Sequence, residues 1–174
     1  AGLVTKRREL WAMGGWNHLS VQAESDPAAR TALDSMVTAI REIDRTFSVF
    51  DPLSALSQMN TTGALSIPVD SPLLLDAIDA SLEHARAFAG AFDPTVEPLM
   101  RRWGFRDDQR VASMTARPSS VRDWDYRMIA CDGQNARVLR ESASVMLDTG
   151  GWAKGLSAER AALAAVRTGA VSAQ

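Results

Sequence analysis

The sequence predicts an α+β fold, on three observations. Apolar residues recur at helical spacing in several segments, prolines and capping residues mark where those helices begin, and short apolar runs beside turn residues indicate hairpins. Helices interspersed with hairpins favour an antiparallel sheet over a doubly wound parallel sheet. A chain of 174 residues is long enough for one core and short for two, so we expect a single domain over residues 1–174.

The first third of the chain predicts a hairpin followed by a long helix. Between Arg8 and Glu24, two short strands of alternating character flank a Gly-Gly turn within MGGWN. Ser25-Asp26-Pro27 then has the form of a helix cap with proline in the first turn. The apolar residues that follow at helical spacing are Leu33, Met36, Val37, Ile40, Ile43 and Phe47.

The middle of the chain predicts two more helices. Asp51-Pro52 indicates a turn, and Ser54 is placed to cap a short helix. A brief strand is expected over residues 65–69. The capping pattern repeats at Asp70-Ser71-Pro72, and the helix that follows is expected to stop at Gly90.

The last third predicts a hairpin, a strand and a helix. YRMIAC and ARVLR flank residues 132–135, a good hairpin loop, and a further strand is expected over residues 144–147. From Phe105 to Pro118 the sequence has no periodicity. The final helix is expected from about Trp152 to Thr168, with Gly169 placed to end it.

Composition narrows the class of protein. The chain is 46% apolar and 23% charged, and its net charge of −2 with interspersed signs gives no basic surface for nucleic acid. No run of eighteen apolar residues predicts a membrane span, and the N-terminal residues lack the apolar stretch of a signal peptide. Cys131 is the only cysteine, which excludes an internal disulfide and a cysteine-rich zinc site.

The segment GAFDPTVEPLMRRWGF, residues 90–105, admits a structural and a functional interpretation. Asp93-Pro94 is the residue pair of a helix N-cap with proline at the first helical position, which needs no chemistry. Trp103 and Phe105 are residue types that more often anchor a core than bind a ligand. Taken alone, the structural interpretation is favoured, and a site is the alternative.

LDTGGWAKG, residues 147–155, is a sharper signal for a binding site. An apolar segment ends at Asp148, two glycines allow close backbone approach, and a helix begins with its free N–H groups facing that bend. Lys154 lies in the first turn, where the helix dipole disfavours a cation, so a bound phosphate would stabilise it. A glycine-rich turn with a solvated lysine is the alternative. The segment is neither a Walker loop nor a GxGxxG motif.

Four segments in order carry a specific resemblance. AMGGWNHLSV, FSVFDPLSALSQMN, GAFDPTVEPLMRRWGF and LDTGGWAKGLSAERA together resemble the FAD:protein FMN transferases, the ApbE family, from about Trp11 to the C-terminus. The resemblance implies a T-fold-related α+β domain with an antiparallel sheet. It also implies an enzyme that moves FMN from FAD onto a threonine or serine of a target flavoprotein, using Mg²⁺ and releasing AMP.

The resemblance also assigns site residues. The positions that match the family's flavin contacts are Met13, Phe50, Ala91, Phe92, Asp93, Asp148 and Lys154. Lys154 is the candidate catalytic residue, because a cation beside the FAD diphosphate would stabilise the transferred charge. Gly151 matches the residue whose carbonyl binds the metal. Mg²⁺ requires about six oxygen ligands, so other groups must complete its shell.

Departures from the family pattern qualify these expectations. Gly15 stands where the family usually has threonine, and Ala55 stands where it commonly has glutamate. Glu97 replaces a glycine, and this glutamate adds negative charge near a diphosphate. Members are longer, and their second half supplies metal-binding side chains. The chain is therefore expected to lack the family's C-terminal half. Either it is a fragment, or a homodimer or a complementing second chain completes the site. Many members are membrane-attached and work outside the cytoplasm.

Three alternatives to the transferase stay open. Water in place of the protein hydroxyl would make the chain an FAD pyrophosphatase, which hydrolyses FAD to FMN and AMP. A chain without the metal-binding side chains would be a non-catalytic FAD-binding module or a fragment that depends on a partner. A strand edge left unpaired at the C-terminus would favour association with a second chain.

Overall fold

The computed structural model describes residues 2–106 and 124–174. Contacts within the chain divide it into two compact units, one formed by Ala1–Ser48 with Trp152–Gln174 and the other by Val49–Gly151. Both units combine helices with antiparallel sheets, which confirms the predicted α+β class. The aperiodic stretch expected after Phe105 lies largely outside the described residues.

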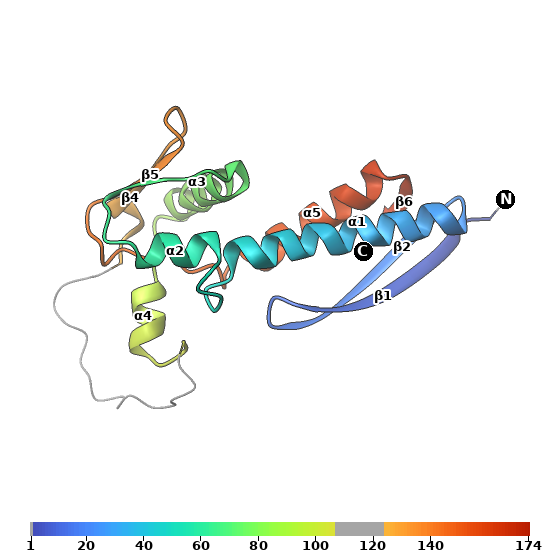
Figure 1. Ribbon diagram of the computed structural model, residues 1–174, viewed down its shortest axis with the longest axis horizontal. Coiled ribbons are helices and arrows are strands. Elements are labelled where there is room, and N and C mark those ends of the chain that lie inside the picture. The colour runs from blue at the N-terminus through green and yellow to red at the C-terminus, as the bar shows by residue number, and fades with distance from the viewer. Residues whose placement is uncertain (1, 107–123) are drawn as a thin grey trace. The chain divides into compact units, whose positions relative to one another are not determined.

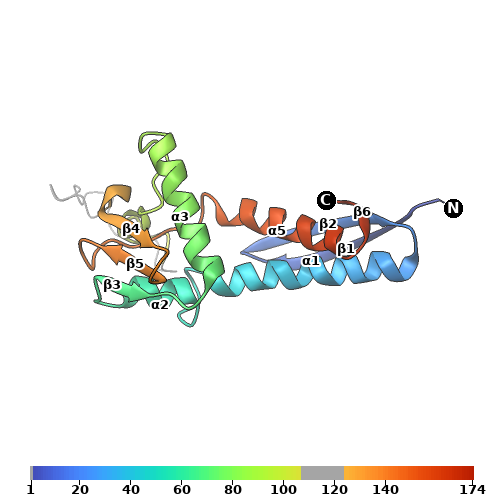
Figure 2. The same cartoon turned by 90° about the horizontal axis from the view of Figure 1, so that it is seen from above.

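The first unit is a three-stranded sheet covered on one face by two helices. Its elements are β1 (Val4–Ala12), β2 (Gly15–Ala23), α1 (Asp26–Phe47), α5 (Ala153–Arg167) and β6 (Ala170–Ala173). The strand order is β1-β2-β6, and α1 and α5 lie side by side against the sheet (Figures 1 and 2). The core between them is made of the inward apolar residues Leu10, Ala12, Leu19, Val21, Ala23, Ala29, Ala32, Leu33, Met36, Ile40, Ala161, Ala165 and Ala170.

The opening hairpin turns one residue earlier than predicted. The register pairs Ala12 with Gly15, so the two turn residues are Met13 and Gly14. Both have positive φ, 54° and 74°, as a type I′ turn requires. Because Gly15 already belongs to β2, the expected Gly-Gly turn is wrong. A methionine with left-handed φ is uncommon, and such strain is typical of functional positions.

A predicted helix start is confirmed at α1 and a predicted helix stop at α5. Ser25 caps α1, and its hydroxyl accepts a hydrogen bond from the amide of Ala28, followed by Asp26 and Pro27 in the first turn. Thr168 is the C-cap of α5, and Gly169 follows with φ of 97°. The sequence did not predict β6, which follows this glycine and pairs antiparallel with β2.

The second unit holds the remaining elements. These are α2 (Ala55–Thr61), β3 (Ser66–Pro68), α3 (Pro72–Ala87), α4 (Glu97–Arg102), the 3₁₀ turn η1 (Tyr126–Met128), β4 (Ile129–Asp132) and β5 (Arg137–Arg140). Strands β3, β5 and β4 form a sheet in that order, with α3 against β4. Ser54 and Ser71 cap α2 and α3 as predicted, and Gly90 ends α3 with φ of 79°. The predicted β4–β5 hairpin is confirmed, with its loop at residues 133–136, one residue later than expected.

Two predicted elements of the second unit are wrong. Residues 144–147 form no strand, and the bridge described for them joins Met146 to Val96. Side chains satisfy this backbone instead: Arg140 donates to the carbonyl of Val145, and Asn60 bonds both backbone groups of Leu147. Asp93-Pro94 does not start a helix either. Instead α4 begins at Glu97, because the Asp93 carboxylate closes a tight turn at residue 95.

Candidate active site

Asp148 lies at the end of a segment whose backbone is fixed by the rest of the second unit. Its amide donates to the carbonyl of Pro94 over 2.8 Å, which joins the segment to the Asp93 loop. The buried side chain of Asn60 holds the preceding residue, Leu147, through two hydrogen bonds of 2.9 Å. The Asp148 carboxylate then accepts from the amide of Gly150. Three segments that are distant in sequence therefore meet at Asp148.

Asp93 organises the loop that joins α3 to α4. One carboxylate oxygen accepts from the amide and the hydroxyl of the buried Thr95, over 2.8 and 2.6 Å. The other accepts from the amide of Tyr126 over 3.1 Å. A carboxylate with three donors is held in one orientation. In this structure Asp93 therefore closes its own loop and ties it to η1.

Phe92 and Gly151 approach each other closely. A Cβ atom at Gly151 would lie 3.2 Å from the edge of the Phe92 ring, so a glycine gives this ring its room. Upstream, Ala89 and Gly90 both have positive φ, and this reverses the chain before Ala91. The loop of residues 91–93 and the glycine-rich turn at 150–151 therefore lie together within the second unit.

A chain of four alternating charges lies next to these loops. Glu97 is 0% exposed, and its two oxygens accept from Nε of Arg101 over 2.9 Å and from Nε of Arg106 over 2.8 Å. Arg106 Nη2 also pairs with the carboxylate of Asp148. The negative charge expected from Glu97 is therefore balanced by two arginines, and the site does not carry it as an excess charge.

The ring of Phe50 lies against Arg106. The guanidinium carbon of Arg106 is 5.2 Å from the centre of the Phe50 ring, within cation–π range, and Phe50 is 71% exposed. Sequence reasoning missed Arg106 because its partners lie 9 and 42 residues away and no spacing rule connects them. Only the Glu97–Arg101 pair, at four residues apart on a helix, carried a local signal.

Met13 and Lys154 lie in the first unit and line one hollow there. Its volume is about 380 Å³, and its wall includes Met36 and Ile40 from α1 and Ala161 from α5. Lys154 is exposed and stands in the first turn of α5, as predicted. The residues predicted for the site thus fall into two groups: this pair in the first unit, and the Phe50, residue 91–93, Asp148 and Gly151 group in the second.

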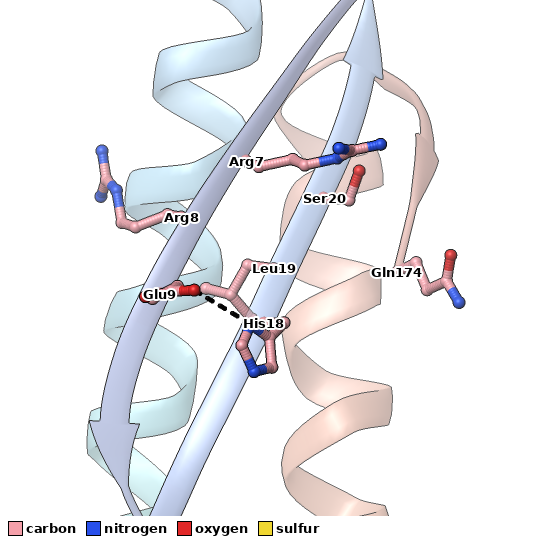
Figure 3. A pocket seen from close by; sticks show the side chains of 7 residues that line it. All are labelled: Arg7, Arg8, Glu9, His18, Leu19, Ser20 and Gln174. Atoms are coloured by element: carbon pink, nitrogen blue, oxygen red, sulfur yellow. Dashed lines mark ion pairs between the residues drawn. The ribbon is translucent and has the colours of Figure 1, made fainter.

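A second hollow of the first unit, of about 420 Å³, holds none of the predicted site residues. Figure 3 shows Glu9 of β1 facing His18 of β2, whose Nδ1 is 3.4 Å from the Glu9 carboxylate, with Gln174 on the other side of β2. The register pairs Glu9 with His18 directly. The His18 side chain is exposed here.

The described residues do not supply a magnesium donor set. Within residues 2–106 and 124–174, no group of three or more His, Cys, Asp or Glu side chains could hold a metal ion. The Asp148 carboxylate is already held by Arg106 and the amide of Gly150. One carbonyl from Gly151 would leave most of an octahedral shell to other groups.

Comparison with known proteins assigns the family. The model of the ApbE family matches residues 13–173. The chain belongs to the ApbE family. Among curated relatives, an FAD:protein FMN transferase of Chlamydia trachomatis serovar D is 29% identical over 141 residues, which are 79% of this chain and 44% of the relative.

Solved ApbE structures share the fold. An ApbE protein of Thermotoga maritima superposes with a TM-score of 0.82 at 27% identity, over 95% of this chain and 53% of the other. The flavinyl transferase ApbE of Pseudomonas stutzeri, in its apo form, gives 0.83 at 20% identity, over 99% and 58%. The flavin transferase ApbE of Vibrio cholerae gives 0.82 at 17%, over 98% and 56%. The chain thus spans about half the length of these relatives.

The ApbE fold of the described residues includes no helix that is long and apolar enough to cross a membrane.

Proposed function

We propose that this ApbE-family chain takes part in the transfer of FMN from FAD to a threonine or serine of a target flavoprotein. The acceptor hydroxyl oxygen forms a bond to the FMN phosphorus, and the bond from that phosphorus to the bridging oxygen breaks. AMP leaves with the bridging oxygen, and the hydroxyl proton is released. Little covalent chemistry falls to the protein, which acts by positioning and by electrostatic stabilisation.

The observation that carries this proposal is the convergence of three sequence segments in the second unit. The Phe50 segment, the Asp93 loop and the Asp148 turn come together through the Arg106 contacts, the bond from Asp148 to Pro94, and the packing of Phe92 on Gly151. These are three of the four segments on which the family resemblance rests. Aromatic rings with fixed polar groups beside them suit a flat, partly polar ring system such as a flavin.

We also propose Met13 and Lys154, in the first unit, as FAD contacts. The hollow they line is largely apolar, which suits part of a flavin nucleotide, and the lysine adds the cation that a diphosphate requires. Lys154 stands at the positive end of the α5 dipole. An anion there is therefore favoured both by the lysine charge and by the helix N-terminus. We assign Lys154 the catalytic role of stabilising the charge on the diphosphate oxygens.

The magnesium requirement is proposed from the family resemblance. Gly151 would contribute one backbone carbonyl, and we attribute no step to the metal because the described residues do not supply the rest of its shell. A comparison of activity in Mg²⁺ with activity in a chelator tests it. If turnover is unchanged in the chelator, the assignment of Gly151 as a metal ligand is wrong.

The test of the proposed function is an assay of the purified chain with FAD, Mg²⁺ and a threonine-containing acceptor protein. The transferase proposal expects AMP release together with flavin bound covalently to the acceptor. AMP release that is equal without acceptor would identify a pyrophosphatase. Saturable quenching of FAD fluorescence without AMP release would identify a binding module. An absence of binding by the folded chain would contradict all three.

Association and location are further proposals from the same resemblance. We propose that a second copy or a complementing chain supplies the remaining part of the active site. Light scattering coupled to gel filtration tests self-association, and a monomer that transfers flavin by itself would contradict it.

The family resemblance also favours work outside the cytoplasm, which cell fractionation of the native host tests.

A further inference from the structure

The guanidinium of Arg106 touches three groups of the candidate site at once. It donates from Nε to the Glu97 carboxylate over 2.8 Å, it pairs through Nη2 with Asp148, and its central carbon Cζ lies 5.2 Å from the centre of the Phe50 ring. Its side chain is only 13% exposed. An arginine so enclosed contacts groups on both the Phe50 segment and the Asp148 turn.

The Glu97 carboxylate holds the Arg106 guanidinium in its position between Phe50 and Asp148. A fully buried carboxylate is costly unless it is paired and hydrogen-bonded, and both of its oxygens are taken by arginines. Arg101 holds one oxygen from the next turn of α4, which leaves the other for Arg106. Buried ion pairs contribute little net stability compared with apolar packing, but they fix geometry. Glu97 is therefore the anchor of Arg106.

We propose that Arg106 is a positioning residue of the candidate flavin site. Anchored by Glu97, its guanidinium holds the Asp148 carboxylate and the Phe50 ring in the arrangement that receives the flavin nucleotide. This inference rests on the proposed function, because Asp148 and Phe50 are flavin contacts only under that proposal. A planar guanidinium suits the role, since it reaches two carboxylates with separate N–H groups and stacks on a ring, whereas a lysine cannot do all three.

The test is a titration of the full 174-residue chain with FAD, followed by flavin fluorescence and by the absorption band of the bound flavin. Arg106→Gln is expected to raise the FAD dissociation constant at least about tenfold, about 1.4 kcal/mol. It should also change the bound flavin's band, because the Phe50 ring loses its fixed neighbour. Arg106→Lys keeps the positive charge, so its FAD dissociation constant should lie between those of the wild type and Arg106→Gln. Arg137→Gln is the control, since the Arg137 side chain donates only to Ser66 among its described hydrogen-bond partners.

A double-mutant cycle with Glu97→Gln tests the anchor. Because Glu97 acts through Arg106, its substitution should weaken FAD binding in the wild-type background and have no further effect in Arg106→Gln. Circular dichroism establishes that each variant is folded, and Arg106→Lys carries the test if Arg106→Gln does not fold. The inference would be overturned if the folded Arg106 variants bind FAD within about threefold of wild type and leave the flavin band unchanged. It would also be overturned if the effects of the Glu97 and Arg106 substitutions on FAD affinity are strictly additive. Neither result would contradict the proposed function. A wild-type chain that binds no FAD would overturn the proposed function and this inference together.

Discussion

The side chain of Asn60 replaces a strand partner for Leu147. Its amide nitrogen donates to the Leu147 carbonyl and its amide oxygen accepts from the Leu147 amide, both over 2.9 Å. Asn60 is 2% exposed, so no bulk water can take over these bonds. The backbone that leads into Asp148 is therefore held by one side chain of α2 rather than by a sheet.

Asn60→Ala should loosen this segment and destabilise the fold. The substitution leaves the buried amide and carbonyl of Leu147 without partners, which costs roughly 1–3 kcal/mol for each group. Hydrogen exchange at the Leu147 amide should accelerate, and the thermal midpoint should fall. Gln58→Ala, at an exposed position of the same helix, is the control and should change stability by at most about 0.5 kcal/mol. Unchanged exchange at Leu147 in Asn60→Ala would contradict the role given to Asn60.

Met13→Asn should separate stability from binding. Asparagine tolerates positive φ and is favoured with glycine in a type I′ turn, so the hairpin should gain on the order of 1 kcal/mol. If Met13 contacts the flavin, FAD affinity should fall in the same variant, a trade-off typical of strained functional positions. Thermal unfolding and FAD titration measure the two effects. A variant that is more stable and binds FAD as well as wild type would remove Met13 from the site.

Lys154→Ala should affect FAD and leave the fold unchanged. The lysine is exposed, so its removal should change stability by only about half a kcal/mol. If it stabilises the diphosphate, FAD binding or AMP release should fall strongly, and high salt should weaken wild-type binding more than that of the variant. Arg160→Ala removes an exposed cation of the same helix and is the control. Equal behaviour of the two variants would identify Lys154 as a solvated surface residue.

Cys131 should be unreactive in the folded chain. The pKa of its thiol is raised from 9.0 to about 12. Burial against α3 is the larger cause, and the negative charge of Asp79 is the next. The thiolate is the reactive form, so iodoacetamide at pH 8.5 should label the folded chain much more slowly than the chain in urea. The unfolded thiol ionises first, near its ordinary pKa. This thiol therefore lowers stability as pH rises from about 9 to 12, and Cys131→Ala should reduce that loss. Rapid labelling of the folded chain would contradict the prediction.

The helices were predictable because their signals are local. Ser25, Ser54 and Ser71 each cap a helix that begins at the next residue, and Gly90 and Gly169 adopt the positive φ expected after a helix end. Such rules depend on backbone groups within a few residues of each other, so the sequence contains them in full. The failures at residues 93 and 144–147 have one cause, because in both places a side chain took the backbone groups that an ordinary helix or strand would have used.

The candidate site was predictable in its segments and not in its connections. The residues 50, 91–93, 148 and 151 were identified from family resemblance, and the structure gathers them in one unit. The Glu97–Arg106–Asp148 connection was not predicted, because ion pairs between distant residues leave no periodic pattern. In the sequence Glu97 adds a negative charge, and in the structure Arg101 and Arg106 balance that charge.

The sequence by itself determined the α+β class, the capped helices, the hairpins and the segments that relate the chain to the ApbE family. These follow from local propensity, hydrophobic period and motif order. Only the tertiary structure decided that Arg106 joins Phe50 to Asp148 and that Asn60 replaces a strand partner. The physical reason is that buried polar groups must find partners, and which partner lies within reach is set by how the chain packs.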